Sequence, residues 1–327
     1  MYNKSCYYDS ILDVIGHTPM VQLHKVALGL PCEVFAKLEF LNPTGSSKDR
    51  IAKYLIERAE QDGQIKPGDT ILESSSGNTA MGLALIAIQK GYKLKVVVRD
   101  STSKEKLDML MALGATIIKA DTSLPPTHDN SYNNIAKKLA KEEVDCYFPD
   151  QHNNRDNNEA HYRSTGPEIW DQMNGQIDVF IAGMGTGGTI GGIGRYLKEK
   201  KPEIRIVAVD VEGSVFTSYF YTGKTEEPRH YLLEGLGDEF IINCADFSVI
   251  DDLVQVSDKE AFHSARELVM KEGILAGGSS GAVLQAIRKI APTLAPNTRV
   301  ATLFPDGASR YLGTIFNDDW MKKKGML

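Results

Sequence analysis

Short runs of β-branched and apolar residues alternate along this chain with segments in which apolar residues recur at helical spacing. Ala52, Leu55, Ile56 and Ala59, for example, follow the pattern i, i+3, i+4, i+7, which gives a helix one apolar face. Strands that alternate with helices form parallel sheets covered by helices on both faces. The 327 residues therefore predict an α/β protein with two open, mostly parallel, twisted sheets flanked by helices. The strand-like runs are 33–39, 93–98, 115–120, 178–183, 204–210 and 300–304, and the further helical segments are 104–112, 132–141, 191–200, 258–272 and 280–290.

The charge balance and the absence of long apolar runs exclude several classes of protein. Lys and Arg number 37 and Asp and Glu 43, a net charge of −6, and the only basic cluster is Lys322–Lys324. Nucleic-acid binding needs clustered basic residues, so we expect no nucleic-acid partner. No stretch approaches the roughly 20 apolar residues of a membrane span, and the first residues lack the apolar core of a secretory signal. We expect no contact with membranes.

The cysteine pattern bears on redox state and metal binding. Cys6, Cys32, Cys146 and Cys244 form no C-x-x-C pair, and their spacing suits no common zinc module. We therefore expect reduced thiols, a cytoplasmic location and no metal site.

Four polar or glycine-rich segments each follow a strand-like run or begin a helical segment. Ligands of open α/β sheets bind at the carboxyl ends of the strands, so these segments are candidate ligand-binding loops. They are N-P-T-G-S-S-K-D-R (42–50), E-S-S-S-G-N-T-A (73–80), G-M-G-T-G-G-T-I-G-G (183–192) and E-G-I-L-A-G-G-S-S-G-A (272–282).

The first loop places Lys48 where a helix should begin. The helix dipole disfavours a cation there, and one explanation is an uncharged amine, for example in a Schiff base. The alternative is a solvated surface lysine.

The second loop offers hydroxyls, an amide and backbone N–H groups at a helix start, which suit a carboxylate. Its alternative is a simple N-cap at Ser76 or Asn78. In the fourth loop, Ser279 can bond a ring nitrogen, or its neighbouring glycines serve tight helix packing.

The third loop has two interpretations. Gly183, Gly185 and Gly188 match G-x-G-x-x-G, and Asp210 follows 22 residues later, as in dinucleotide-binding proteins. This interpretation predicts an NAD(P)-dependent oxidoreductase that uses residues 183–188. The threonines of G-T-G-G-T, however, add hydroxyl donors that suit a phosphate monoester at a helix N-terminus. We favour this phosphate cup.

A lysine at a helix start, a phosphate cup, a carboxylate loop and a lone serine together match one cofactor, pyridoxal 5′-phosphate. The chain resembles the fold-type II pyridoxal-phosphate enzymes of the cysteine synthase and cystathionine β-synthase family, whose fold is like that of tryptophan synthase β. The resemblance runs from 15–23 to 317–325, and five motifs occur in family order. They are S-S-K-D-R, S-S-G-N-T, G-T-G-G-T, E-G-L-G and G-G-S-S-G.

The resemblance implies two α/β domains with the cofactor between them. Residues 1–10 and 40–150 would form a smaller, mobile domain, and residues 11–39 and 151–327 a larger one. The turn-rich segment 145–155 agrees with a boundary there. The irregular segment 213–233 is a candidate substrate loop or a plain surface excursion.

The resemblance also assigns roles to residues of this chain. Lys48 would carry the cofactor as a Schiff base and act as the base at Cα, Asn78 would lie beside the ring hydroxyl, and Ser279 would face the pyridine nitrogen. The phosphate would be held by Gly185, Thr186, Gly187, Gly188 and Thr189, and the substrate carboxylate by Ser75, Ser76, Gly77, Asn78 and Thr79.

The implied reaction is β-replacement on L-serine or an activated serine. The segments 210–214, 233–240 and the N-D-D-W-M terminus resemble cystathionine β-synthase more than cysteine synthase, so homocysteine is the expected thiol and cystathionine the product. Glu234 is a candidate to bind the amino group of the second amino acid, or it is a solvated or structural carboxylate. His152 stands where the family usually has Tyr or Phe, and it either packs the loop or changes the preference for the second substrate.

Several alternatives stay open at this point. Relatives with a short core include cysteine synthases, which use O-acetylserine or O-phosphoserine with sulfide, and cysteine β-lyases, which release hydrogen sulfide. Ala80 and Ser74 depart from the usual glycine and proline of the motif. A binding protein on the same scaffold is a further possibility. The sequence lacks the family's haem-binding extension, so we expect no haem. The expected partners are amino-acid and thiol substrates and a second copy in a homodimer.

Overall fold

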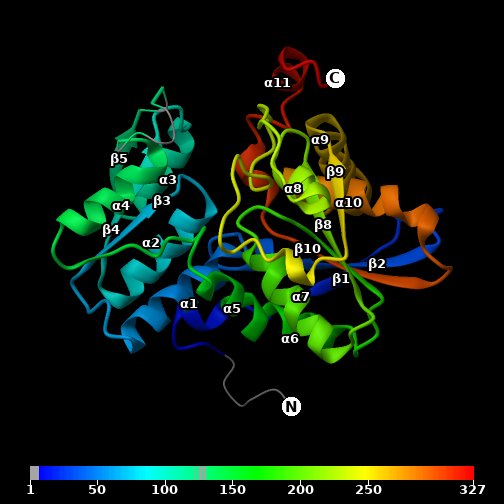
Figure 1. Cartoon of the computed structure of the whole chain (residues 1–327), viewed down its shortest axis with the longest axis horizontal. Helices are drawn as coiled ribbons and strands as arrows, with labels where there is room; N and C mark the ends of the chain where they lie inside the picture. Colours follow the sequence, from blue (N-terminus) through cyan, green and yellow to red (C-terminus); the bar gives the residue numbers. More distant parts are fainter. Residues whose placement is uncertain (1–6, 122, 125–127, 129) are drawn as a thin grey trace. The chain divides into compact units, whose positions relative to one another are not determined.

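The computed structural model describes residues 7–121, 123–124, 128 and 130–327. It divides the chain into two compact units, and each is an α/β structure of its own (Figure 1). The first unit comprises the chain up to Gly16 and Asn42–Asp156. The second comprises His17–Leu41 and Asn157–Leu327.

The first unit contains a four-stranded sheet in the order β5-β4-β3-β6, and all of its pairs are parallel. Side chains alternate between its faces along each strand. Val96 and Val98 therefore pack with α1, α2 and α3, whereas Val97 packs with α4 on the other face. The strands are β3 (Thr70–Ser74), β4 (Lys93–Arg99), β5 (Thr116–Ala120) and β6 (Cys146–Tyr147), and the helices are η1 (Ile11–Val14), α1 (Lys48–Gln61), α2 (Asn78–Lys90), α3 (Lys104–Ala112) and α4 (Tyr132–Glu142).

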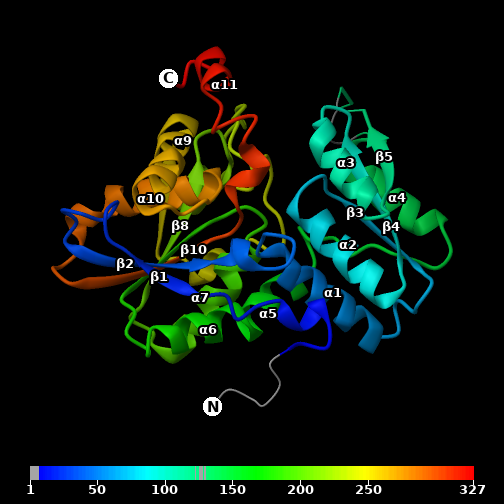
Figure 2. The same cartoon turned by 180° about the vertical axis from the view of Figure 1, so that it is seen from behind.

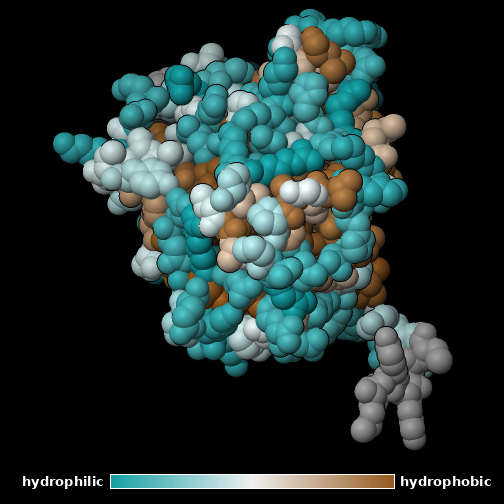
Figure 3. Space-filling view, turned by 90° about the vertical axis from the view of Figure 1, so that its right-hand side faces the viewer, coloured by the Kyte–Doolittle hydropathy of each residue, from teal (hydrophilic) through white to brown (hydrophobic). Residues whose placement is uncertain are grey.

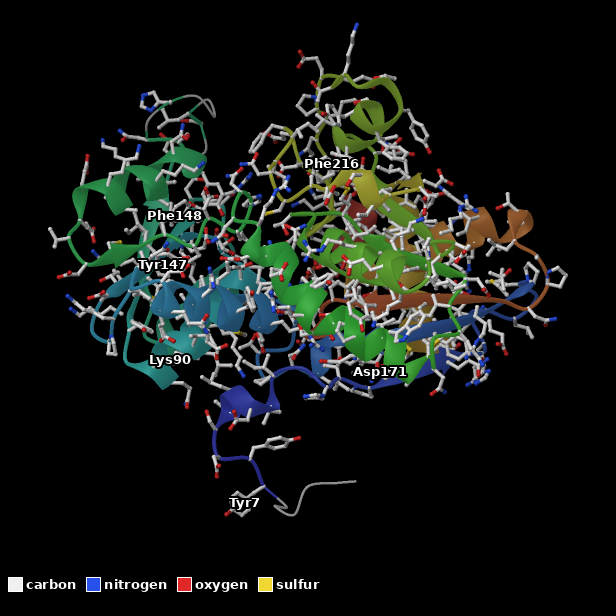
Figure 4. All side chains as sticks on the ribbon, turned by 60° about the horizontal axis from the view of Figure 1, so that its bottom comes forward. Tyr7, Lys90, Tyr147, Phe148, Asp171 and Phe216 are labelled. Atoms are coloured by element: carbon white, nitrogen blue, oxygen red, sulfur yellow. The ribbon has the colours of Figure 1, made fainter. Side chains whose placement is uncertain are left out.

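Helices α1 and α2 pack closely in the first unit. A Cβ atom at Gly82 of α2 would lie 2.9 Å from the carbonyl oxygen of Lys48 and 3.1 Å from Cβ of Ala52, so only glycine permits this approach. At the other end of α2, Lys90 (Figure 4) pairs with Glu60 of α1 at 2.7 Å. The packing fixes the starts of α1 and α2, which carry two of the candidate loops, relative to each other.

The second unit contains a six-stranded sheet in the order β1-β2-β10-β7-β8-β9. Only the edge strand β1 is antiparallel to its neighbour; Figure 2 shows β1 and β2 beside β10. The strands are β1 (Met20–Leu23), β2 (Cys32–Leu38), β7 (Val179–Gly183), β8 (Arg205–Val211), β9 (Asp252–Val256) and β10 (Thr298–Phe304).

The helices of the second unit cover both faces of its sheet. Val207 and Val209 of β8 pack with α9 and α10, whereas Ile206 and Ala208 pack with α6, α7 and the fully buried Phe216 at the start of α8 (Figure 4). The helices are α5 (Asp156–Arg163), α6 (Thr165–Gln172), α7 (Gly188–Lys200), α8 (Phe216–Thr222), α9 (Asp258–Glu267), α10 (Gly278–Ile290) and α11 (Asp318–Lys323), and the helical turns are η2 (Glu39–Leu41), η3 (Phe247–Val249), η4 (Leu268–Glu272), η5 (Ala291–Thr293) and η6 (Ala308–Tyr311).

The predicted fold class, α/β with two mostly parallel sheets flanked by helices, is confirmed. All six strand-like runs overlap strands, namely β2, β4, β5, β7, β8 and β10. The sequence pattern did not predict β1, β3, β6 and β9. The segment 213–233 is also less irregular than expected, because α8 lies within it.

Three general features of the described residues bear on the sequence expectations. None of their helices is long and apolar enough to cross a membrane, and the face in Figure 3 is mostly hydrophilic with apolar residues between. Cys32, Cys146 and Cys244 are free thiols, and Cys6 lies outside the described residues. Within the same residues, no cluster of three or more His, Cys, Asp or Glu side chains could hold a metal ion.

Candidate active site

Lys48 is the first residue of α1, and the turn before it is held by its neighbour Asp49. The Asp49 carboxylate accepts a hydrogen bond of 2.7 Å from the backbone N–H of Thr44 and another from the Thr44 hydroxyl. Gly45 has a φ of +84°, a left-handed conformation that favours glycine, and the backbone N–H of Lys48 donates to the Ser46 hydroxyl at 3.3 Å. Lys48 is half-buried, whereas Asp49 is fully buried. The turn therefore holds the backbone of Lys48 in one place.

The predicted carboxylate loop, Ser75–Thr79, connects the end of β3 to the start of α2. Ser75 is buried, and its N–H donates to the carbonyl of Val97 at 3.1 Å, while its hydroxyl accepts from the N–H of Gly77 at 3.3 Å. Ser76, Gly77 and Asn78 are half-buried. A Cβ atom at Gly77 would meet nothing within 4 Å. The middle of the loop thus lies beside open space, while its ends are anchored.

This loop is supported by two polar residues to which the sequence assigned no role. The buried side chain of Gln151 accepts a hydrogen bond of 2.5 Å from the Thr79 hydroxyl, and its backbone N–H donates to Glu73 at 3.3 Å. Glu73 also accepts from the N–H of Ser74 at 2.9 Å. Burial raises the pKa of Glu73 to about 7, although the nearby His152 opposes the rise. His152 is half-buried, and it belongs to this loop support in the first unit.

The predicted phosphate cup, Gly185–Thr189, lies between β7 and α7 in the second unit. Gly187 has a φ of +80° and precedes the first residue of α7. A Cβ atom at Gly185 would lie 2.3 Å from the carbonyl oxygen of Gly235, and one at Gly187 2.6 Å from that of Cys244. The glycines are therefore required, because other backbone segments approach the cup closely from behind.

Helix α5 lies against the cup and contacts both of its threonines. Asn157 Nδ2 lies 3.1 Å from Thr186 Oγ1, and His161 Nε2 lies 3.2 Å from Thr189 Oγ1. Asn157 is 1% exposed and His161 0%, whereas both threonines are half-buried. Neither of these α5 residues was predicted from the sequence. The only signal was a polar helical segment, D-N-N-E-A-H-Y-R, which resembles a solvated helix.

Ser279 is the second residue of α10 and is 5% exposed. The start of this helix is packed against Asp306, since a Cβ atom at Gly277 would lie 2.2 Å from Asp306 Oδ1. The Tyr311 hydroxyl donates to Asp306 Oδ2 at 2.6 Å. Burial raises the pKa of Tyr311 well above its usual value, and the charges of Asp306 and Glu234 raise it further.

Glu234 is exposed and lies on a segment that contacts the cup. The residue after it, Gly235, approaches Gly185, and the N–H of Gly237 donates to the carbonyl of Met184 at 2.9 Å. The charge of Glu234 raises the pKa of Tyr311, so the two side chains lie near each other. The second unit therefore contains Glu234, the cup, and Ser279 with the residues Asp306 and Tyr311 that pack at the start of its helix. Lys48, Ser75–Thr79 and His152 belong to the first unit.

Asp210, the acidic residue of the dinucleotide interpretation, has a local partner. It is buried at the end of β8, and its Oδ2 accepts from the N–H of Thr217 at 3.0 Å and from the Thr217 hydroxyl at 2.7 Å. Burial raises the pKa of this carboxyl, and the bonds from Thr217 oppose the rise. Asp210 is thus bonded to α8 through Oδ2, which gives it a structural role in the second unit.

The residues of each unit fit pyridoxal 5′-phosphate. A phosphate needs several donors near one point, and the cup offers backbone N–H groups and two hydroxyls at the positive end of α7, which has no side-chain cap. The close contacts behind Gly185 and Gly187 keep this loop in a cradle shape. In the first unit, the half-buried residue Lys48 supplies an amine, as a lysine-bound cofactor requires.

Comparisons with known proteins agree with this fit. The chain matches the family model described as pyridoxal-phosphate dependent enzyme over residues 11–306. It is 44% identical over 319 residues to cystathionine beta-synthase of Apis mellifera, covering 97% of this chain and 63% of that protein. It is 40% identical over 329 residues to the Saccharomyces cerevisiae protein of that name, covering 97% of this chain and 64% of the relative. The chain thus spans less than two thirds of the length of these curated relatives.

Two solved structures resemble the chain over nearly their whole length. The O-acetylserine dependent cystathionine beta-synthase of Helicobacter pylori is 38% identical, with a TM-score of 0.86, and the match covers 95% of this chain and 99% of that one. A hydrogen sulfide-producing enzyme of Fusobacterium nucleatum is 34% identical, with a TM-score of 0.85, covering 94% and 98%. These matches favour the phosphate cup over the dinucleotide interpretation. The chain therefore belongs to the family of pyridoxal-phosphate dependent enzymes, and pyridoxal 5′-phosphate is its cofactor.

Proposed function

We propose that this enzyme joins L-serine, or a serine activated at its hydroxyl, to homocysteine and thereby forms cystathionine. One observation carries the proposal: relatives named cystathionine beta-synthase match 97% of the chain at up to 44% identity. The Helicobacter pylori protein, whose length the match covers almost completely, is described as O-acetylserine dependent. This description favours an activated serine as the first substrate.

Each unit supplies different groups to the proposed reaction. When bound, the cofactor withdraws electrons from Cα of the attached amino acid. Lys48 takes the Cα proton and later returns it, and its place at the start of α1 favours the uncharged amine that this role needs. The loop Ser75–Thr79 would hold the substrate carboxylate through donors other than the N–H groups of Ser75 and Gly77, which are already bonded within the protein, and Asn78 would lie beside the ring hydroxyl.

The second unit would anchor the phosphate at Gly185–Thr189 and meet the ring nitrogen with Ser279. A hydroxyl does not stabilise a full positive charge there as a carboxylate would. Less of the negative charge that develops at Cα would then spread into the ring, and this would favour loss of the β-substituent over transamination or racemisation. Glu234 would meet the amino group of homocysteine, and its exposure and its position next to Gly235, which approaches the cup, support this role. The predicted homodimer and cytoplasmic location remain predictions.

A second candidate activity is release of hydrogen sulfide from cysteine. The similarity to the Fusobacterium nucleatum enzyme favours it. In chemical terms the two activities share the removal of the β-substituent and differ in the thiol that adds or leaves. Cysteine synthesis from O-acetylserine or O-phosphoserine with sulfide belongs to the same set.

A substrate panel decides among these activities. Serine, O-acetylserine, O-phosphoserine and cysteine are each offered with homocysteine, with sulfide or alone, and the products are resolved by mass. We expect cystathionine from an activated serine with homocysteine as the fastest reaction. Exclusive activity with O-acetylserine and sulfide would replace the proposal with cysteine synthesis, and hydrogen sulfide from cysteine alone would support the second candidate.

A variant pair tests the role of Lys48. Borohydride should fix the cofactor to this residue, and Lys48→Ala should lose the visible absorbance of the lysine-bound cofactor and at least about 100-fold of the activity. Lys53 is the matched control, because it lies on the same helix and its amine donates to the carbonyl of Leu12 at 3.0 Å. Lys53→Ala should keep both properties. Full activity in Lys48→Ala would contradict the assignment.

A further inference from the structure

Helix α5 presents a buried polar face to the phosphate cup. Asn157, Asn158 and His161 are 1%, 8% and 0% exposed. Asn157 and His161 are four residues apart and so lie on the same side of the helix. The backbone of α7 is packed tightly onto this side, since a Cβ atom at Gly192 would lie 2.1 Å from the carbonyl oxygen of Asn158. A buried polar face against a glycine-rich helix needs an explanation beyond packing.

The two side chains reach the two hydroxyls of the cup. Asn157 Nδ2 donates to Thr186 Oγ1 at 3.1 Å, and His161 Nε2 lies 3.2 Å from Thr189 Oγ1. The other ring nitrogen, Nδ1, lies 2.9 Å from Thr165 Oγ1 at the start of α6. Each cup threonine therefore has one buried partner on α5, while its own side chain is half-buried.

Proton counting sets the direction of these bonds. A threonine hydroxyl has one proton, which it can donate only once. The amide nitrogen of Asn157 only donates, so Thr186 accepts from it and keeps its proton for a ligand. Thr189 keeps its proton only if the ring of His161 carries hydrogen on Nε2. In the neutral ring with hydrogen there, Nδ1 accepts from the hydroxyl of Thr165.

We propose that Asn157 and His161 are positioning residues that orient the hydroxyl protons of Thr186 and Thr189 toward the cofactor phosphate. The inference rests on the assignment of that phosphate to residues 185–189 in the proposed function. In the resulting chain, Thr165 donates to His161, His161 donates to Thr189, and Thr189 donates to the anion. Hydrogen bonds that run in one direction strengthen one another, so the chain favours a bound phosphate. The phosphate in turn selects the Nε2–H form of His161.

Three substitutions test the proposal in the complete enzyme. His161→Gln places an amide nitrogen close to the position of Nε2, whereas the shorter His161→Asn matches Nδ1 and does not reach Thr189. Asn157→Ala removes the donor to Thr186. We expect His161→Asn and Asn157→Ala to weaken pyridoxal 5′-phosphate binding about tenfold each, the value of one hydrogen bond, and His161→Gln to restore most of it.

Glu159→Gln is the matched control on the same helix. The Glu159 carboxylate pairs with Arg163 at 2.6 Å and with Arg195, and not with a threonine of the cup. The control therefore loses an ion pair and some stability, but it should leave the phosphorus NMR shift of the bound cofactor unchanged. That shift should move in Asn157→Ala and His161→Asn, and a purely structural role for these residues would not move it.

Pyridoxal without its phosphate separates the inference from the proposed function. Its affinity should be the same in the wild type and in all variants, because the threonine hydroxyls have no anion to meet. The inference is overturned if His161→Asn and Asn157→Ala bind pyridoxal 5′-phosphate as the wild type does, with an unchanged phosphorus shift. If the wild type itself binds pyridoxal as tightly as its phosphate ester, the assignment of the cup fails instead.

Discussion

The phosphate cup and the carboxylate loop are built alike but are supported in opposite ways. Each connects a parallel strand to a helix, and in each a threonine hydroxyl meets a buried amide or imidazole. In the cup, Thr186 accepts from Asn157, so its proton stays available. In the loop, Thr79 donates to Gln151, so its proton is used inside the protein. The threonines of the cup can therefore donate to an anion, whereas Thr79 of the loop cannot, and the loop must use its serine hydroxyls and its remaining backbone N–H groups instead.

The two loops also differ in how tightly the protein surrounds them. Backbone atoms crowd the rear of the cup at Gly185 and Gly187, whereas nothing lies within 4 Å of a Cβ atom at Gly77 in the loop. A cofactor remains bound through many turnovers, and a substrate enters and leaves in each one. A rigid cup and a more open loop agree with those two tasks. The difference can be tested by substitutions that are matched across the two sites.

The largest effect is expected from Gly187→Ala in the cup, with Gly77→Ala in the carboxylate loop as its matched variant. In Gly187→Ala, Cβ would lie 2.6 Å from the carbonyl oxygen of Cys244, and the residue would keep a φ of +80°. Overpacking and left-handed strain together should destabilise the second unit by about 4 kcal/mol and release the cofactor. Gly77→Ala meets no protein atom and should keep the cofactor. Urea unfolding measures the stability of each variant, and cofactor retention on a desalting column measures whether the cofactor stays bound. Equal losses in the two variants would remove the contrast in packing.

The second effect concerns the acid beneath the carboxylate loop. Burial raises the pKa of Glu73 to about 7, above its value in an unfolded chain. Between pH 4.5 and 7 the folded protein therefore holds a proton that the unfolded chain has lost, and stability falls as the pH rises. The wild type should lose about 3 kcal/mol relative to Glu73→Gln over this window. Urea unfolding of both proteins from pH 5 to pH 8 gives the difference.

Glu267 supplies the control for this pH effect. The Arg288 guanidinium lowers the pKa of Glu267 to about 2, with help from Lys271, so its carboxylate is ionised throughout pH 5 to 8. Glu267→Gln should change the stability by a constant amount across that range. The difference in unfolding free energy between the wild type and Glu73→Gln could also be constant from pH 5 to pH 8. That result would show that Glu73 is already ionised in the folded enzyme across this range.

The sequence predicted much of the fold and the position of both loops, but not what lies behind them. Strands β4 and β8 contain uninterrupted apolar runs, V-V-V and I-V-A-V, and were predicted, whereas β3, T-I-L-E-S, has only two apolar residues beside the buried Glu73 and was not predicted. Glycines next to threonines marked the cup. His161 could not be found in this way, because it is 28 residues from Thr189 and lies on a helix with a polar sequence. Only the fold brings such residues together.

The smallest effect should come from removing one hydroxyl at each site. Thr189→Val deletes a donor to the phosphate and should weaken cofactor binding about tenfold, with little change in KM for the amino acid. Thr79→Val leaves the buried Gln151 side chain without this donor and should loosen the loop, so that KM rises by about tenfold while cofactor affinity stays unchanged. Cofactor titration of the apoenzyme and steady-state kinetics separate the two. The contrary outcome is that Thr79→Val lowers cofactor affinity as much as Thr189→Val does. The loop and the cup would then not serve separate ligands, and the opposite roles of their threonines would have no functional consequence.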